Sequence, residues 1–351
     1  VADESTSEVQ RRYLSRAIAE RLPGFGDVVY EDWSALLSRL ARDARAERWR
    51  GPVIFDELPY LVSASKELPS VMQRWLDHDA KDAGLVVAVA GSSQRMMQGL
   101  VLSAEAPLYG RARELLEIQP LDPRWLPSAF VGLDGIELVT CFAAWGGVPR
   151  YWELAIDIEG DTVQRVDRLV LDPLGPLHRE PDRLLLEEVP TALELRPVLD
   201  AIGGGAHRVS EIGGRIGRPA TSMARPLKRL VEMGLVRRET PFGEPPRSTR
   251  RSLYKIDDPF VRLWFRTVAP NRAQLASSTP AGRRRLFKHG WGGLLAEAWE
   301  DLCRLRVPQT TIAGAAAWGP AQRWWRGGMP EWDVVSESED GKRLLLGEAK
   351  W

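Results

Sequence analysis

The sequence predicts an α/β chain of several domains, and three observations support that expectation. Two short runs rich in β-branched residues, Val53–Phe55 and Leu85–Ala90, are typical of parallel strands that are buried on both faces. Amphipathic helical patterns alternate with these runs over residues 1–155, as a layered α/β fold requires. A length of 351 residues is enough for two or three domains, each with its own core.

The composition is that of a globular protein whose charge is unevenly distributed. Apolar residues make up 44% and charged residues 27% of the chain. No apolar run approaches the roughly 20 residues of a membrane span, and no signal-peptide pattern is present. Cys141 and Cys303 are far apart and lack metal-ligand spacing, which predicts a reduced, cytoplasmic setting. The net charge is zero, but residues 207–255 hold 12 basic and 4 acidic side chains, against 17 and 21 in residues 1–150. That cationic segment is typical of a nucleic-acid-facing module.

Residues 1–120 are expected to form the first domain. Apolar spacing predicts helices and strands in alternation, over 31–46, 53–57, 68–82, 85–90 and 114–118. Prolines at 120, 123 and 127 interrupt this pattern. The next domain, residues 121–184, is expected to be a helical lid.

Polar side chains follow the first two strands at the points where these strands end. Asp56 and Glu57 follow the first strand, and Gly91, Ser92 and Ser93 follow the second. Acids at such a strand end hold Mg²⁺ and polarise water in phosphoryl transfer, while a neighbouring polar tip senses the γ-phosphate. The alternative is an acidic strand end that faces solvent.

Basic side chains lie a short distance beyond the second strand. A guanidinium stabilises the charge that builds on phosphoryl oxygens, and Arg111 and Arg113 are the candidates for this role. Either could instead be an ordinary surface charge.

Residues 185–257 show a different pattern of predicted helices and strands. Helical patterns cover about 187–202, 209–212 and 221–233, and Gly234 lies where a C-terminal cap belongs. Two strand patterns, 235–238 and 252–256, follow and are joined by a Pro- and Arg-rich loop. Three helices followed by a β-hairpin are the element order of a winged-helix domain.

Polar and basic side chains of this segment are candidates for DNA contact. The third helix and its start carry Thr221, Ser222, Arg225, Lys228 and Arg229. The hairpin carries Arg237, Arg238, Arg247, Arg250 and Arg251. A helix with polar tips fits a major groove, and an Arg-rich wing suits the phosphate backbone. The alternative is a regulatory winged helix that packs on the first domain.

Residues 258–351 are expected to form the last domain. The pattern predicts a helix over 260–268, an Arg-rich link over 282–288, a helix over 294–306, and strands around 331–337 and 343–349. Scattered histidines suggest no metal site, and the 14 tryptophans are expected to fill cores and domain seams.

Acidic and basic side chains of the last two strands form a catalytic pattern. Asp333 lies on one strand, and alternation places Glu348 and Lys350 on the same face of the next. Two carboxylates can hold Mg²⁺, while a lysine orients or deprotonates water. Glu300 would add an acid from a helix. An exposed hairpin with alternating charges is the alternative.

Together these motifs resemble a known family. Phe-Asp-Glu at 55–57, Gly-Ser-Ser at 91–93, Pro-Leu-Tyr-Gly-Arg at 107–111 and Gly-Gly-Val-Pro-Arg-Tyr at 146–151 look like those of prokaryotic, chiefly archaeal-type, AAA/STAND-related P-loop ATPases. Such proteins carry a winged helix and a C-terminal PD-(D/E)xK nuclease-like domain. The resemblance implies a partial α/β P-loop NTPase core, then a winged-helix domain, then a truncated restriction-endonuclease-like α/β domain.

The resemblance also implies roles for individual residues. ATP and Mg²⁺ would be the cofactors, with Asp56 as the Mg²⁺ acid, Glu57 as the water-activating acid and Ser92 or Ser93 as the sensor. Gly147 and Pro149 would lie against the adenine and couple nucleotide state to the lid. Glu300, Asp333 and Glu348 would be metal ligands of the nuclease-like domain, with Lys350 beside them.

The sequence contains no G-x-x-x-x-G-K-[ST], the loop whose amides and lysine supply most phosphate affinity. We therefore expect a fragment that binds ATP poorly and shows no measurable ATPase activity, an expectation that turnover abolished by Glu57→Gln would overturn. The strand-like run that stops at Trp351 likewise predicts a shortened last domain.

These observations favour an ATP-dependent switch protein whose core controls a DNA-binding winged helix and a nuclease-like module. DNA is the expected partner, an oligomer or a partner protein remains open, and no membrane contact is expected. One alternative is a non-catalytic DNA-binding regulator whose last domain is a scaffold. Another is a truncated, inactive gene remnant.

Overall fold

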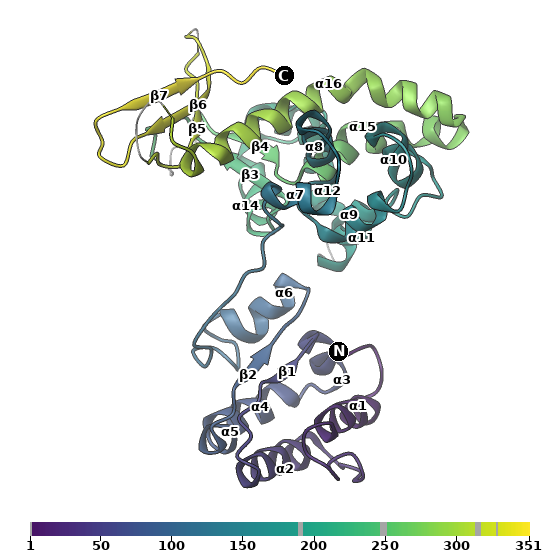
Figure 1. Ribbon diagram of the computed structural model, residues 1–351, viewed down its shortest axis with the longest axis vertical. Helices are drawn as coiled ribbons and strands as arrows, with labels where there is room; N and C mark the ends of the chain where they lie inside the picture. The colour runs from purple at the N-terminus through teal and green to yellow at the C-terminus, as the bar shows by residue number, and fades with distance from the viewer. Residues whose placement is uncertain (1, 189–191, 246–250, 313–316, 328) are drawn as a thin grey trace. The chain divides into compact units, whose positions relative to one another are not determined.

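The computed structural model describes residues 2–188, 192–245, 251–312, 317–327 and 329–351 of a mixed α/β chain (Figure 1). The chain forms two compact units, of which the first contains Val1–Glu117 with Glu187–Val189. The second contains Ile118–Leu186 and Pro190–Trp351. No helix in these described ranges has both the length and the apolar character needed to cross a membrane.

The first unit is built around a small parallel sheet. Strands β1 (Val53–Phe55) and β2 (Val87–Val89) pair in parallel, with Phe55 opposite Val89, as the two apolar runs predict. The helices of this unit are α1 (Ser7–Ala19), α2 (Trp33–Ala46), α3 (Leu58–Ala64), α4 (Leu68–Asp77), α5 (Asp79–Ala83) and α6 (Gln94–Met97), and α6 continues as the π-helical η1 (Gln98–Leu102).

Helices α2 and α4 supply much of the core of this unit. Helix α2 is capped by Asp32, whose carboxylate accepts a hydrogen bond from the Ala35 amide at 2.7 Å. Its buried side chains include Leu36, Leu37 and Leu40. Phe55 of β1 and Trp75 of α4 meet edge to face in the same core, with ring centroids 6.4 Å apart.

Two expectations for the first unit are wrong. The strands are not buried on both faces, because Ile54 of β1 is 58% exposed and Ala88 of β2 is also exposed. The segment 114–118 is not a strand either, and Leu115, Leu116 and Ile118 are exposed. It pairs with neither β1 nor β2, and a strand needs a neighbour for its backbone hydrogen bonds.

The second unit begins with helices, as the expected lid does. They are η2 (Pro123–Trp125), α7 (Leu126–Ala129), α8 (Gly135–Trp145), α9 (Pro149–Ile156), α10 (Thr162–Val166), η3 (Asp167–Leu171) and α11 (Glu180–Glu188). Asp134 and Glu137 form a reciprocal capping box at the start of α8.

A group of helices and a β-hairpin follows in the predicted order. The elements are α12 (Ala192–Gly203), α13 (Val209–Arg215), η4 (Ala220–Met223), α14 (Ala224–Glu232), β3 (Val236–Glu239) and β4 (Leu253–Ile256). Most of the helix expected over about 187–202 is found as α12 and its first residues belong to α11, while residues 189–191 lie outside the described residues. Gly234 has a φ of +67°, which allows it to end α14, and Leu235 donates back to the Leu230 carbonyl at 3.1 Å.

Long helices and a small sheet complete the second unit. The elements are α15 (Pro259–Ser277), α16 (Pro280–Arg306), η5 (Val307–Gln309), β5 (Gln322–Trp324), β6 (Trp332–Glu337) and β7 (Leu344–Gly347). Antiparallel pairing joins β5, β6 and β7 in that order. The expected hairpin forms, but β7 ends at Gly347, before Glu348 and Lys350.

The Arg-rich link expected over 282–288 is instead part of α16. Thr279 caps this helix and Pro280 is its first residue. Arg283 is buried and forms salt bridges with Asp167 and Asp172, each at 2.8 Å. Because acids of η3 and the turn after it neutralise these positive charges, the basic run folds as helix.

Candidate functional site

The carboxyl ends of β1 and β2 bring the predicted acid and serine together. Glu57 Oε2 accepts hydrogen bonds from Ser92 Oγ at 3.1 Å and from the Ser92 amide at 3.4 Å. Glu57 has a φ of +55°, an uncommon conformation for a residue other than glycine. Asp56 Oδ1 accepts from the Glu57 amide at 3.1 Å. The parallel register therefore places Asp56, Glu57 and Ser92 at one edge of the sheet.

Ser93, the other candidate sensor, is oriented differently. Its Oγ accepts from the Met96 amide at 3.4 Å, at the beginning of α6. Gly91 fits closely between β2 and the helices, since a Cβ there would lie 2.7 Å from Pro59 Cδ and 2.8 Å from Met97 Sδ. Of the two serines, the structure brings Ser92 to Glu57.

Arg111 is bound to the end of α4. Its Nε and Nη2 donate to the two carboxylate oxygens of Asp77, each at 2.8 Å. The pKa of Asp77 is lowered by this hydrogen-bonded guanidinium. Arg111 also donates to the Pro107 and Tyr109 carbonyls. The structure thus holds Arg111 by a carboxylate of its own unit, while Arg113 is exposed.

Gly147 and Pro149 belong to the second unit. The Leu121 amide donates to the Gly147 carbonyl at 2.7 Å, and a Cβ on Gly147 would lie 2.4 Å from the Leu121 carbonyl oxygen. Pro149 is the first residue of α9. Backbone packing within this unit accounts for the glycine and the proline, and their expected contact with adenine stays a prediction.

Helix α14 presents a cationic face. Leu227 and Leu230 are buried, whereas Arg225 and Lys228 are exposed one turn apart. Lys228 lies 3.5 Å from Glu232, in a pair whose side chains are both mostly exposed. Thr221 and Ser222 are exposed on η4, just before the helix, and Arg229 is half-buried.

The described arginines of the hairpin have partners within the protein, and the expected DNA-contacting role of Arg237 stays a prediction. The Arg237 guanidinium contacts Asp301 of α16 at 2.6 Å, Glu239 at 2.8 Å and Asp257 at 3.3 Å. Arg238 donates to Ser252 Oγ at 2.8 Å and Arg251 to Glu244 at 2.5 Å. Arg247 and Arg250 lie outside the described residues.

Asp301 is the centre of this charge cluster. Its carboxylate accepts hydrogen bonds from Arg237 and Arg304 at 2.6 Å and from Arg262 at 2.9 Å. Although burial opposes ionisation, these positive charges hold the pKa of Asp301 well below its usual range. Glu297, one turn earlier on α16, lies 3.5 Å from the buried Lys255 of β4 and 3.0 Å from Arg266.

The cluster joins elements that are far apart in the sequence. It links the β3–β4 hairpin to α15 and α16, and the Phe242 amide after β3 donates to the Arg323 carbonyl of β5 at 2.8 Å. A cavity of about 370 Å³ lies beside it, lined by His207, Lys255, Glu297, Glu300 and Arg323 among others. The sequence reasoning missed Asp301 and Glu297. Acids spaced by four residues on one helix are a signal, but their partners come from other elements.

The C-terminal set is only partly assembled. Lys350 Nζ lies 3.0 Å from Glu348 Oε2, and their side chains are 82% and 53% exposed. Asp333 Oδ2 accepts from the Ala349 amide at 3.1 Å, next to that pair. Glu300 instead faces Arg304 and Arg323, at 3.5 and 3.8 Å. In the part of the chain that the structure describes, no three acidic, histidine or cysteine side chains gather as a metal site would require.

Comparison with known proteins finds similarity to a family model, to an archaeal protein and to a solved structure. Residues 264–351 match the family model DUF234, described as archaeal and bacterial proteins of unknown function. An uncharacterized protein of Methanocaldococcus jannaschii is 27% identical over 327 residues, which are 92% of this chain and 70% of the relative. The Aeropyrum pernix Orc1 protein in complex with DNA is similar over 77% of this chain and 76% of that one, at 15% identity and a TM-score of 0.28. The family match begins within α15 and includes the acids of α16 and the C-terminal sheet.

Proposed function

We propose that this chain is the DNA-binding part of an ATP-dependent switch protein related to the AAA/STAND ATPases, with α14 as the helix that contacts DNA. The observation that carries the proposal is the exposed cationic face of α14, the third helix of a helix–helix–helix–hairpin module. In winged-helix proteins the third helix enters the major groove.

Among the residues that the structure describes, the side chains proposed to contact DNA lie on α14 and at its beginning. Arg225 and Lys228 suit phosphate oxygens, and Thr221 and Ser222 offer hydroxyl groups at the end of the helix that would approach base edges. Arg237, held by Asp301, contributes to stability rather than to DNA affinity. Each phosphate contact made by α14 makes the affinity for a duplex decrease as the salt concentration rises.

The test is a DNA titration of the double variant Arg225→Ala/Lys228→Ala at several salt concentrations. We expect about two fewer counterions to be released, so that the slope of log affinity against log salt becomes less negative by about 1.8. The charge-matched control is Arg124→Ala/Arg150→Ala, which removes two exposed guanidinium groups from other helices. Equal slopes for the two double variants would refute an α14 interface.

The arrangement at β1 and β2 favours a second activity, ATP hydrolysis in the complete switch. The supporting observation is the Glu57–Ser92 hydrogen bond at 3.1 Å. Glu57 would activate water, Asp56 would hold Mg²⁺ and Ser92 would sense the γ-phosphate. The side chains present fit a hydrated Mg²⁺, which is commonly bound through one or two carboxylates. Magnesium would supply charge neutralisation at the phosphate oxygens.

A hydrolysis test needs a phosphate-binding loop, which the present sequence lacks. When a segment with that loop is supplied by a longer chain, Glu57→Gln should abolish turnover while ATP is still bound. Ser93→Ala serves as the matched control and should leave turnover nearly unchanged, because Ser93 faces Met96 rather than Glu57. Equal loss in both variants would contradict these roles.

For the C-terminal domain we propose a scaffold role rather than DNA cleavage. Glu348 and Lys350 neutralise each other at the surface, and Glu300 is paired with arginines. The expected result is no nicking of supercoiled DNA with Mg²⁺ or Mn²⁺. Metal-dependent nicking that disappears in Lys350→Ala would instead establish a PD-(D/E)xK nuclease with Asp333 and Glu348 as metal ligands.

A further inference from the structure

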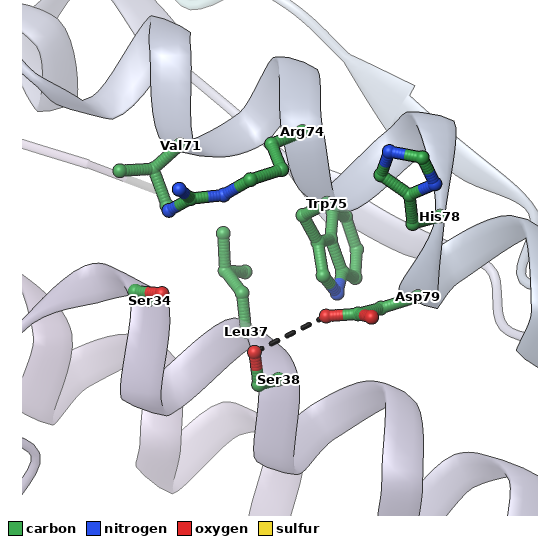
Figure 2. A pocket seen from close by; sticks show the side chains of 8 residues that line it. All are labelled: Ser34, Leu37, Ser38, Val71, Arg74, Trp75, His78 and Asp79. Atoms are coloured by element: carbon green, nitrogen blue, oxygen red, sulfur yellow. Dashed lines mark hydrogen bonds between the residues drawn. The ribbon is translucent and has the colours of Figure 1, made fainter.

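A cavity of about 270 Å³ in the first unit is used by neither proposed activity. It lies between α2 and α4 and extends to the start of α5 (Figure 2). Leu37, Val71 and the ring of Trp75 form its apolar lining. Ser34, Arg74 and Asp79 are polar residues around it.

The indole N–H of Trp75 lacks a hydrogen-bond acceptor among the described residues. The side chain is nevertheless nearly buried, with 3% of the residue exposed. A buried donor without a partner costs about 1–3 kcal/mol, and native proteins rarely keep one. A ligand oxygen would remove this cost.

Asp79 covers the side of the cavity that the indole nitrogen faces. Figure 2 shows the nitrogen on the edge of the ring toward Asp79, whose carboxylate accepts from Ser38 Oγ at 3.1 Å. Asp79 is exposed and lies at the start of the short helix α5. This side chain can therefore turn outward without unpacking the core, and an incoming oxygen can then reach the indole N–H.

The charges around the cavity favour a particular ligand. Arg74 is exposed and its guanidinium extends along the cavity (Figure 2). One guanidinium beside one acid suits a single negative charge better than a phosphate dianion. A carboxylate can accept from Arg74 and from the indole N–H, while the apolar lining contacts a hydrocarbon body.

We propose that this cavity binds a small monocarboxylate with an apolar body, held by Arg74 and the Trp75 indole N–H in place of Asp79. A volume of 270 Å³ corresponds to about nine water molecules, at roughly 30 Å³ each, which is room for a benzoate-sized molecule. The ligand is thus recognised by a neutral donor, a cation and a hydrophobic surface.

The test follows the Trp75 indole ¹H–¹⁵N resonance of the full chain labelled with ¹⁵N-tryptophan, and sodium benzoate is the probe. Trp75→Phe identifies the resonance by its loss and keeps an aromatic ring against Phe55. We expect a saturable shift of the resonance with benzoate. Sodium chloride and inorganic phosphate at the same ionic strength should produce only a small shift.

Variants with opposite expected effects distinguish this site from a general charge effect. Arg74→Ala should weaken benzoate binding by about tenfold, the effect of losing a hydrogen bond to a charged group. Asp79→Ala should strengthen it, because a like charge is removed and the N–H is uncovered. The control Arg42→Ala removes an exposed arginine of α2 that is paired with Asp43, and should change nothing.

Two results would overturn the proposal. One is a Trp75 resonance that moves no further with benzoate than with sodium chloride or phosphate. The other is equal benzoate affinity in Arg74→Ala and Arg42→Ala, which would mean that the Arg74 guanidinium does not contact the carboxylate.

Discussion

Asp301→Asn tests whether the charge cluster at α16 holds the hairpin in place. The wild-type carboxylate accepts from three guanidinium groups, those of Arg237, Arg262 and Arg304, at 2.6–2.9 Å. The Arg262 side chain is only 3% exposed, so water cannot replace the lost charge there. Breaking a buried pair on one side costs about 3–5 kcal/mol, because it leaves uncompensated charge in the interior.

The assay is urea unfolding followed by tryptophan fluorescence and circular dichroism. With a denaturant slope of about 3 kcal/mol per molar, the midpoint for the second unit should fall by about 1–2 M. Asp257→Asn is the matched control, because Asp257 contacts the same Arg237 at 3.3 Å but is 50% exposed. Its loss should cost less than about 1 kcal/mol. Equal midpoints for the two variants would refute the assignment of stability to buried charge.

Three further outcomes are expected. Burial raises the pKa of Asp258, the N-cap of α15, to about 6. The contribution of this residue to stability is therefore full below pH 3.8 and is lost as pH rises through 6. Asp258→Asn should keep the helix cap and remove that pH dependence. It should therefore raise the free energy of unfolding at pH 7 by up to about 3 kcal/mol. The control Asp134→Asn changes an exposed cap and should not raise the free energy of unfolding. Charge partners lower the pKa of Glu297 to about 2. Its contribution to stability is therefore present above pH 4.5 and lost as pH falls through 2. Glu297→Gln should reduce the pH dependence of stability in that window, which circular dichroism during acid denaturation can follow. Gly91→Ala should lower the free energy of unfolding by about 1–3 kcal/mol, because the added Cβ would be too close to Pro59 and Met97. The control Gly99→Ala should not destabilise the protein, since a Cβ there would have nothing within 4 Å. Chemical denaturation of both variants measures the difference.

The sequence predicts local structure well where the pattern itself contains the cause. The apolar runs at β1 and β2 form a parallel pair, and the helices and hairpin of residues 192–256 follow in the expected order. Gly234 ends α14 because a left-handed residue is required there. The meeting of Glu57 and Ser92 follows from parallel strands whose carboxyl ends share one edge.

Other expectations failed because the structure of a segment also depends on which distant residues pack or pair with it. The apolar segment 114–118 has the composition of a strand, but it has no paired neighbour in the described structure. The basic run 282–288 has the composition of a link, but Asp167 and Asp172 neutralise Arg283 and allow it to be helical. The composition of a segment does not determine which charges from distant parts of the chain will lie next to it.

The candidate site shows the same division. The residue types at α14, at the strand ends and in the C-terminal set were identified from the sequence. Which of them are available was decided by packing: Arg225 and Lys228 are exposed, while Arg237 is bound to an acid 64 residues away. The unpartnered indole of Trp75 is likewise visible only where α2 and α4 meet.

The sequence by itself determined the strands β1 and β2, the acids and polar residues that follow them, and the order of helices and hairpin over residues 192–256, because these depend on neighbours within a few residues. Only the tertiary structure decided which charges are paired and which are free. The physical reason is that the energy of a charge depends on its distance from other charges and on its burial, and both are set by contacts between elements far apart along the chain.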